Sequence, residues 1–489
     1  MATTLTMLRL HTPTFSLPCL RRLAMCAVTV LLHACQTTPV TLPSGDNAPY
    51  ADLSLAGSGA PQTQNRALPP VVPAIAMSGE VATPTANAIN QSVPAMVSAA
   101  TTLPVASKLQ HTDDMWQRLR DGFALTPLSE DTTQGRLARS ALAHARWYSE
   151  HPALLARMFT RARLYMFDIV ESLDQAHMPL ELALLPAIES AYQTGICSRA
   201  AACGLWQFIR PTGRRFDLRQ HMFVDERNHV RAATQAALRY LAELNVRFNG
   251  DWQLALAAYN WGEGNVEKAV VEARAKGLVG RFEDLKLPRE TADYVPRLLG
   301  LSRLVANPSS MGITLVSMRN APYFVPVPIE RDIDMVLAAR LAGLSLSEFV
   351  ALNSHHKKPV VIAATGAEVY IPVENEAALR EALRMQRGPM SSWTTATVNE
   401  NATVDKAAAT LGVPLSTFRS ANDIRGKRVI VAGSTVLIPR RSGVKGQDIS
   451  RLVAETAVLV TITPYKPKAK RKSVKAARAT PPKSRHLQG

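Results

Sequence analysis

The chain has 489 residues, a hydrophobic fraction of 47% and a formal net charge of +17. A chain of this length can bury a sizeable hydrophobic core and allows two or three domains. The hydrophobic fraction is ordinary for a globular protein, and the positive charge indicates an anionic partner such as nucleic acid, an anionic lipid surface or an acidic polymer.

The N-terminus is typical of an exported protein. Arg21 and Arg22 precede an apolar run of ten residues, LAMCAVTVLL, which is shorter than the roughly 20 residues that a membrane-spanning helix needs. Residues 1–34 are therefore predicted to be a signal peptide. The sequence Leu-His-Ala before Cys35 resembles a bacterial lipobox, which implies that Cys35 carries a lipid. Gln36 then implies the periplasmic face of a Gram-negative outer membrane; the alternative is a plain signal peptide with a chance cysteine.

Residues 35–110 are predicted to be a lipid-anchored disordered linker. Between residues 36 and 110 only five residues are charged, and Ala, Pro, Thr, Ser, Val and Gln dominate. Such a composition cannot bury enough apolar surface to fold. A linker of this kind would let a folded domain reach away from the membrane.

From about Asp113 the pattern becomes helical. Apolar residues recur three and four apart in residues 154–173 and 228–248, as on one face of an α-helix. Asn249-Gly250 and the Gly-Glu-Gly sequence at 262–264 are predicted breaks between helices. We therefore expect an all-α domain over residues 111–315.

A repeat follows the helical region. Residues 343–353 and 412–422 share Gly, Leu-Ser, Phe and Asn at equal offsets, and each copy leads to a β-type run that ends in Ile-Pro. We predict two small βααβ modules, at 322–375 and 393–441, so that the fold class is α+β multidomain. Residues 445–489 are predicted to be a basic disordered tail, because nine Lys or Arg and no acid lie between Pro464 and Gly489.

Glu189 is the first candidate for chemistry. It ends the run MPLELALLPAI, and a glutamate is seldom buried without a partner. Either it lies on the solvent-exposed face of a helix, or apolar surroundings raise its pKa so that it can donate a proton near neutral pH. GLWQ at 204–207, AYN at 258–260 and ETADY at 290–294 follow in order.

This ordered set resembles the lytic transglycosylases of bacterial cell walls, in the style of their membrane-bound type D members, over residues 113–310. The two modules resemble LysM domains, the second more closely than the divergent first. The resemblance implies a lysozyme-like domain that cleaves the bond between N-acetylmuramic acid (MurNAc) and N-acetylglucosamine (GlcNAc) in peptidoglycan without water, giving 1,6-anhydroMurNAc ends. It implies Glu189 as the catalytic residue and a set of substrate-binding residues: Ser190, Gln207, Tyr259, Asn260 and Tyr294.

Several further expectations complete the sequence prediction. Cys197 and Cys203 are a candidate disulfide in an oxidising compartment, with two buried free thiols as the alternative. Trp206 should pack under the cleft, Glu263 should be structural, and His355-His356 should lie in a solvated loop. No metal or cofactor motif is present.

The partners and the rival functions follow from the same residues. We expect a monomer bound to peptidoglycan and, through its anchor, to the membrane. Because an exported protein meets little nucleic acid, we expect none as a partner and assign the tail to peptidoglycan carboxylates or anionic lipids; the alternative is a solvated tail without a partner. Two rival functions remain. One is a goose-type lysozyme, with Asp217 or Asp225 as its second carboxylate, and the other is a non-catalytic peptidoglycan-binding scaffold.

Overall fold

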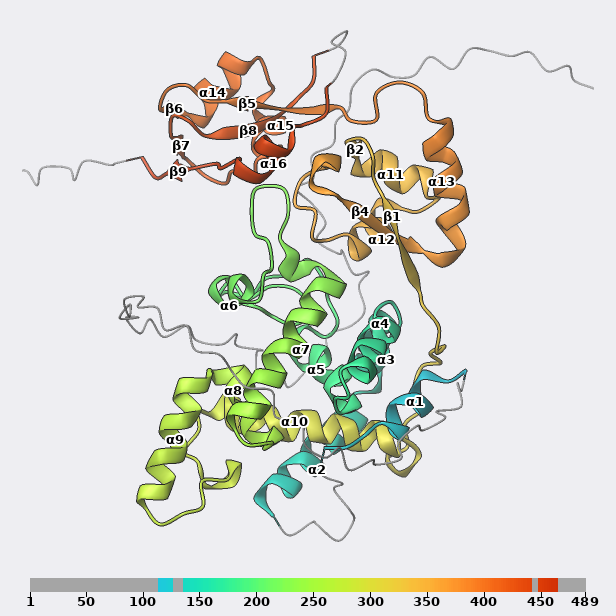
Figure 1. Cartoon of the computed structure of the whole chain (residues 1–489), viewed down its shortest axis with the longest axis vertical. Helices are drawn as coiled ribbons and strands as arrows, with labels where there is room; N and C mark the ends of the chain where they lie inside the picture. Colours follow the sequence, from blue (N-terminus) through green and yellow to red (C-terminus); the bar gives the residue numbers. More distant parts are fainter. Residues whose placement is uncertain (1–112, 126–134, 442–446, 465–489) are drawn as a thin grey trace, which may run out of the picture. The chain divides into compact units, whose positions relative to one another are not determined.

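The computed structural model describes residues 113–125, 135–441 and 447–464 (Figure 1). The predicted signal peptide, Cys35 and the linker lie outside the described residues, as do the most basic residues of the predicted tail, 465–489. Structural statements below refer to the described ranges.

Helices make up the chain from residue 113 to residue 311, as predicted. The α-helices are α1 (Met115–Asp121), α2 (Arg136–Ser149), α3 (Pro152–Ala162), α4 (Met166–Gln175), α5 (Leu185–Ser190), α6 (Arg210–Arg215), α7 (Val230–Arg247), α8 (Trp252–Trp261), α9 (Glu263–Ala275) and α10 (Arg289–Ala306). Short 3-10 helices are η2 (Leu180–Leu184), η3 (Glu226–Asn228), η4 (Phe282–Asp284) and η5 (Ser309–Met311). The described residues of this region contain isolated bridges but no strand.

Local sequence explains where the central helices begin and end. The His229 side chain accepts a hydrogen bond from the Ala232 amide at the start of α7, and the Asp251 carboxylate caps two amides of α8. Such caps satisfy amides that have no partner within the helix. The break predicted at 249–250 separates α7 from α8. The break predicted at 262–264 is confined to Gly262, because Glu263 and Gly264 already belong to α9.

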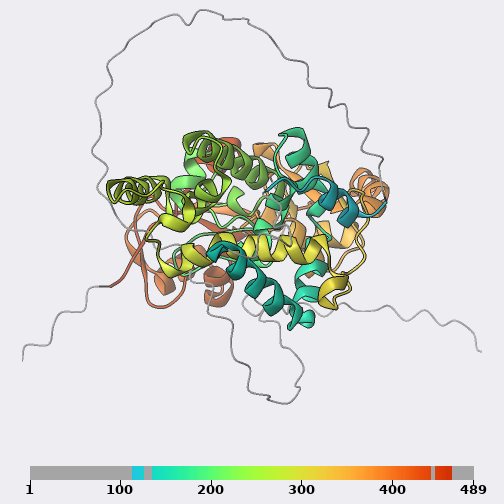
Figure 2. The ribbon, with the colours of Figure 1, turned by 90° about the horizontal axis from the view of Figure 1, so that it is seen from below.

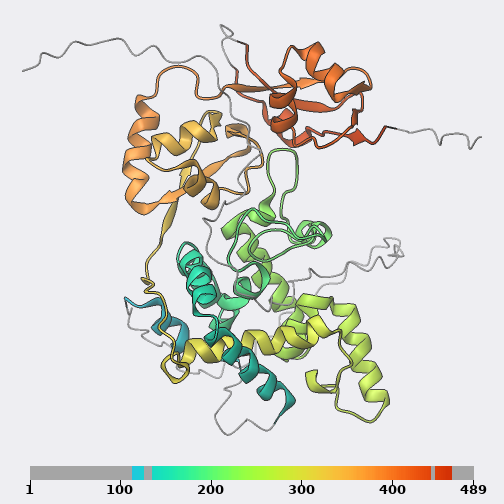
Figure 3. The same ribbon diagram turned by 180° about the vertical axis from the view of Figure 1, so that it is seen from behind.

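One close helix contact shapes the core of this domain. Gly300 of α10 lies so near α2 that an added Cβ would be 2.5 Å from the carbonyl oxygen of Ala141. Figures 2 and 3 show α2 lying against α10. Because α10 also carries Tyr294, this contact fixes one side of the site described below.

The two small modules contain the predicted strand, two helices and strand. In the first, β1 (Phe324–Pro328) pairs antiparallel with β4 (Glu368–Pro372), and α11 (Met335–Leu341) and α12 (Leu346–Leu352) lie between them. In the second, β5 (Trp393–Thr397) pairs antiparallel with β8 (Thr435–Pro439), around α14 (Val404–Leu411) and α15 (Leu415–Ala421). Each module adds a short antiparallel ladder: β2 (Ile333–Asp334) with β3 (Val360–Val361), and β6 (Ala402–Thr403) with β7 (Val429–Ile430). The short helices η6 (Ala363–Thr365) and η7 (Val373–Asn375) and the helix α13 (Glu376–Met385) complete the first module.

The repeated asparagine explains part of the sequence repeat. Asn353 donates to the carbonyls of Phe349 and Tyr370 and accepts from the Tyr370 amide. Asn422 makes the same contacts with the carbonyls of Phe418 and Leu437 and with the Leu437 amide. In both modules one buried amide side chain joins the second helix to the last long strand.

The prediction of a disordered tail from residue 445 was wrong for its first part. Residues 447–464 contain α16 (Arg451–Thr456) and β9 (Thr461–Ile462), which pairs with β7. The apolar residues Ile449, Ala454 and Ala457 are buried in a cluster with Leu437. These residues therefore belong to the folded part of the chain. The nine Lys or Arg between Pro464 and Gly489 all follow them in sequence.

The prediction of a solvated loop at His355-His356 was also wrong. The two residues are 3% and 7% exposed, and the His355 ring lies 4.4 Å from the ring of His229. The Asp225 amide donates to the His355 carbonyl at 2.9 Å. Burial lowers the pKa of His356 to about 4, so that it is neutral at pH 7. The polar sequence suggested solvent, but the residues pack against the loop that precedes α7.

In the part of the chain that the structure describes, no single helix is long and apolar enough to cross a membrane. The pair α11 and α12 reaches the length only together, with a bend of 103°.

The contact at Gly300 gives a prediction of stability. We expect Gly300→Ala to lower the free energy of unfolding by about 1–3 kcal/mol, because two backbones would have to separate. Urea unfolding measures the change. Gly264→Ala is the control, since nothing lies within 4 Å of an added Cβ there, and it should be neutral or stabilising by about 1 kcal/mol. Equal stability of the Gly300→Ala protein and the wild type would contradict the close crossing.

Candidate active site

Glu189 lies in the last turn of the short helix α5. Pro186 stands at the start of this helix, where its fixed φ suits helical geometry. The helix ends because Ala191 and Tyr192 have φ values of 50° and 55°, in the left-handed region. Two consecutive non-glycine residues there store strain, which must be held by other contacts. The Tyr192 hydroxyl donates to the Ala183 carbonyl, and the Arg161 guanidinium donates to the Ala191 carbonyl, both at 2.8 Å.

The carboxyl group of Glu189 is enclosed but not sealed. The residue is half-buried, and its Oε1 accepts a hydrogen bond of 2.5 Å from the Tyr294 hydroxyl. Desolvation raises the pKa of Glu189 to about 7; the hydrogen bond from Tyr294 lowers it, the charge of Glu290 raises it and Arg297 lowers it. The group can therefore both hold and release a proton near neutral pH.

One face of α10 supplies most of the charge near Glu189. Glu290, Tyr294 and Arg297 follow at intervals of four and three residues, so they lie on the same side of the helix. Burial raises the pKa of the Glu290 carboxyl, whereas a hydrogen bond with Asn260 lowers it. Glu290 belongs to the ETADY motif, for which the sequence predicted a role only at Tyr294. Its helical spacing from Tyr294 was the signal that could have found it.

The GLWQ motif forms a tight turn beside α5. Cys203 and Phe208 exchange backbone hydrogen bonds of 3.0 and 3.2 Å, which close the turn at residues 203–208. Gly204 has a φ of 80°, and an added Cβ would lie 1.8 Å from the Arg227 carbonyl oxygen. Only glycine fits this position.

The carbonyl groups of the turn bind the elements around Glu189. The Ser190 hydroxyl donates to the Leu205 carbonyl at 3.0 Å, and the Tyr259 hydroxyl donates to the Trp206 carbonyl at 2.9 Å. The Trp206 ring is fully buried, as expected for a residue under the site, and its Nε1 donates to Thr234. The turn thus joins α5 to α8.

The structure gives the predicted substrate-binding residues different surroundings. Gln207 and Asn260 are half-buried; the Gln207 amide donates to the Gly204 carbonyl, and the Asn260 side-chain oxygen accepts from Thr291. Tyr294 is buried and points its hydroxyl at Glu189. Ser190 is buried, and its hydroxyl is engaged by backbone carbonyls, which suits a supporting contact rather than a contact with sugar.

The other acids considered from the sequence are engaged elsewhere. Glu263 accepts from Tyr240 and Arg215, both at 2.9 Å, as its expected structural role requires. The Asp217 side chain is 92% exposed, and Asp225 is bound by the buried Arg227. A disulfide joins Cys197 to Cys203. Within the described ranges no group of three or more His, Cys, Asp or Glu is arranged to hold a metal.

Comparison with known proteins agrees with this geometry. Residues 169–278 match the family described as Transglycosylase SLT domain, and residues 323–387 match Lytic transglycosylase MltD, LysM-like domain. The chain is 32% identical over 352 residues to "Membrane-bound lytic murein transglycosylase D" of Escherichia coli strain K12, covering 64% of this chain and 78% of the relative. The protein of the same name from Escherichia coli O6:H1 strain CFT073 matches to the same extent.

The helical domain and its site thus define a lytic transglycosylase of the SLT class, followed by a LysM-like domain. More narrowly, the chain belongs to the family of membrane-bound lytic murein transglycosylase D. The predicted family is confirmed, and the LysM-like match falls on the first module, the one that is more divergent in sequence.

Removal of the Tyr294 hydroxyl should change the titration of Glu189. The hydroxyl stabilises the ionised carboxylate, so Tyr294→Phe should raise the pKa of Glu189 above about 7. The alkaline limb of the kcat/KM–pH profile would then move to higher pH, while the maximal rate falls about tenfold or more because a hydrogen bond to a charged group is lost. A limb that moves to lower pH would contradict this arrangement.

Glu189 should also cost stability at neutral pH. Its pKa is raised on folding from 4.5 to about 7, so the folded state loses stability as the pH rises between these values. Glu189→Gln cannot ionise and should be more stable than the wild type at pH 8, by on the order of 1–3 kcal/mol. Urea unfolding at pH 8 and pH 4 tests this, because the difference should vanish at pH 4.

Proposed function

We propose that the protein cleaves the MurNAc–GlcNAc bond of peptidoglycan strands without water and leaves 1,6-anhydroMurNAc ends. The observation that carries this proposal is the enclosed Glu189, whose pKa of about 7 suits a group that acts first as an acid and then as a base. The membership of the chain in the lytic transglycosylase family supports the same reaction.

The proton balance needs a single carboxyl group. Protonated Glu189 donates its proton to the glycosidic oxygen as the bond between that oxygen and C1 of MurNAc breaks. The resulting carboxylate then accepts the proton of the MurNAc C6 hydroxyl, whose oxygen forms the new bond to C1. Glu189 ends the cycle protonated, and no water is consumed. The charge of Glu290 supports the first step, because it raises the pKa of Glu189.

The neighbouring side chains have supporting roles in this proposal. Tyr294 orients the Glu189 carboxyl and stabilises its ionised form through the bond of 2.5 Å. Tyr259 holds the GLWQ turn beside α5. The half-buried Gln207 and Asn260 would bind the N-acetyl or hydroxyl groups of the sugars, whereas Ser190 would fix the end of α5.

A lysozyme-like hydrolase is the second candidate, and Glu290 is the observation that favours it. A glycosidase that inverts the configuration at the anomeric carbon uses a second carboxylate to activate water. Glu290 is close enough to affect the pKa of Glu189, and it bonds to Asn260. The products distinguish the two reactions.

The rest of the chain would bring the enzyme to its substrate. We propose that both modules bind glycan as LysM domains, and that Cys35 carries a lipid on the periplasmic face of a Gram-negative outer membrane. The family name, which describes the relatives as membrane-bound, supports the anchor. The protein would act as a monomer, with its basic tail on peptidoglycan carboxylates or anionic lipids. A scaffold without activity would need no carboxyl with a pKa near 7.

Mass spectrometry of the products tests the reaction. The chain from residue 36 onward would digest purified peptidoglycan beside Glu189→Gln and the control Glu267→Gln, which alters a surface ion pair with Arg247. We expect anhydro ends from the wild type and the control and none from Glu189→Gln. Reducing muramic ends would mean a hydrolase, and binding without products from any protein would mean a scaffold.

A further inference from the structure

Arg227 is a buried cation outside the site described so far. It lies in η3, and its side chain is 2% exposed. Its Nε and Nη2 donate to the two oxygens of Asp225 at 2.9 and 2.6 Å. A buried arginine needs such a partner, because an unpaired charge in the interior is costly.

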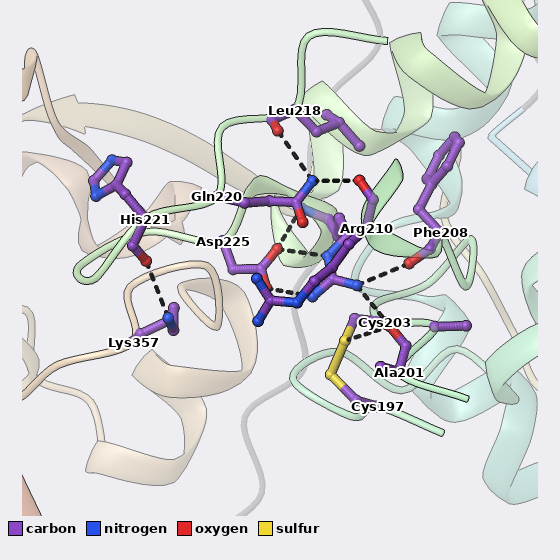
Figure 4. A network of polar contacts seen from close by, with 12 residues as sticks. Cys197, Ala201, Cys203, Phe208, Arg210, Leu218, Gln220, His221, Asp225 and Lys357 are labelled. Carbon is purple, nitrogen blue, oxygen red and sulfur yellow. Dashed lines mark hydrogen bonds and ion pairs between the residues drawn. A yellow bond between two sulfur atoms is a disulfide. The ribbon is translucent and has the colours of Figure 1, made fainter. Parts of the chain in front are cut away.

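The third nitrogen of the guanidinium holds both sides of the GLWQ turn. Arg227 Nη1 donates to the Ala201 carbonyl at 2.7 Å and to the Phe208 carbonyl at 3.1 Å. Figure 4 shows Ala201, Phe208 and Asp225 converging in this network, with the Cys197–Cys203 disulfide beside it. Ala201 precedes the turn and Phe208 closes it, so one side chain fixes both of its ends.

The Arg227 backbone and stem also shape the turn. The Arg227 carbonyl lies against Gly204, and its Cγ and Cδ would lie 3.2 Å from a Cβ added to Gly213 of α6. The carbonyls of Leu205 and Trp206 therefore have little freedom to move. These carbonyls bind Ser190, next to Glu189, and Tyr259.

We propose that Arg227 is a positioning residue for the reaction: its guanidinium holds residues 201–208 so that the Leu205 and Trp206 carbonyls keep Ser190 and Tyr259 in place beside Glu189. The inference rests on the proposed role of Glu189. It differs from a purely structural role, in which Arg227 would only keep the domain folded.

Only arginine meets these demands. Its planar fork binds a carboxylate through two nitrogens and still directs a third at the two carbonyls. Lysine at this position could pair with Asp225 but could not span the carboxylate and both carbonyls. Arg227→Lys should therefore keep the ion pair with Asp225 and lose the hydrogen bonds to the Ala201 and Phe208 carbonyls.

The test compares Arg227→Lys with the double variant Asp225→Leu/Arg227→Met in the chain from residue 36 onward. The double variant removes both charges together, so no unpaired charge remains buried. With rates normalised to the folded fraction, we expect kcat to fall about 100-fold in both, as for a displaced catalytic group. The alkaline limb of the kcat/KM–pH profile should move to lower pH, because Glu189 becomes more hydrated.

Two controls make the outcome decisive. Arg247→Met removes a bidentate pair between Arg247 at the end of α7 and Glu267 of α9, and it should change neither kcat nor the pH limb. If the Arg227 variants lose only thermal stability, with normalised kcat and the pH limb unchanged, Arg227 is structural and the proposal is overturned. If Glu189→Gln stays active, the assignment of the catalytic acid fails, whatever the Arg227 variants show.

Discussion

The enclosure of one carboxyl group, that of Glu189, is the constraint on which the rest of the structure depends. Water is kept from most of this group, and a tyrosine hydroxyl at 2.5 Å takes the place of solvent. This enclosure requires that α5 end directly after Glu189, through two residues with strained backbone conformations. It also requires that α10 pack closely into the domain, which the contact between Gly300 and α2 permits. The folded state accepts an unfavourable ionisation at one residue, and the large apolar core around it compensates.

The GLWQ turn shows how a short motif can act without each side chain meeting substrate. The Leu205 and Trp206 carbonyls bind the neighbouring helices, and the Trp206 ring anchors the turn in the core. Gly204 is required because the backbone carbonyl of Arg227 lies against it. Of the four residues, Gln207 alone is not buried, and it is half-buried at the end of the turn. The main role of this motif is thus to fix the geometry of the backbone beside Glu189.

Periodicity predicted the helical domain and the internal repeat predicted the two modules, because these features depend on residues near one another in sequence. The apolar run before Glu189 marked this residue as a candidate for chemistry. The buried polar contacts could not be predicted in the same way. Arg227 and His355 stand in polar stretches that are typical of surface loops, and only segments distant in sequence bury them. Residues 447–464 are similar, since their apolar positions find partners in β7 and in a shared cluster. Glu290 was visible in the sequence, but its influence on Glu189 depends on the placement of α10.

The loop before α7 has a consequence for any attempt to isolate the catalytic part. Met222, Phe223 and Val224 belong to the helical region in sequence, yet they are buried in one cluster with Val360 and Ile362 of the first module and Leu437 of the second. A fragment that ended near residue 320 would leave these three apolar side chains in water, where they favour self-association. Purified fragments of that length would therefore need polar replacements at these positions to remain soluble at high concentration.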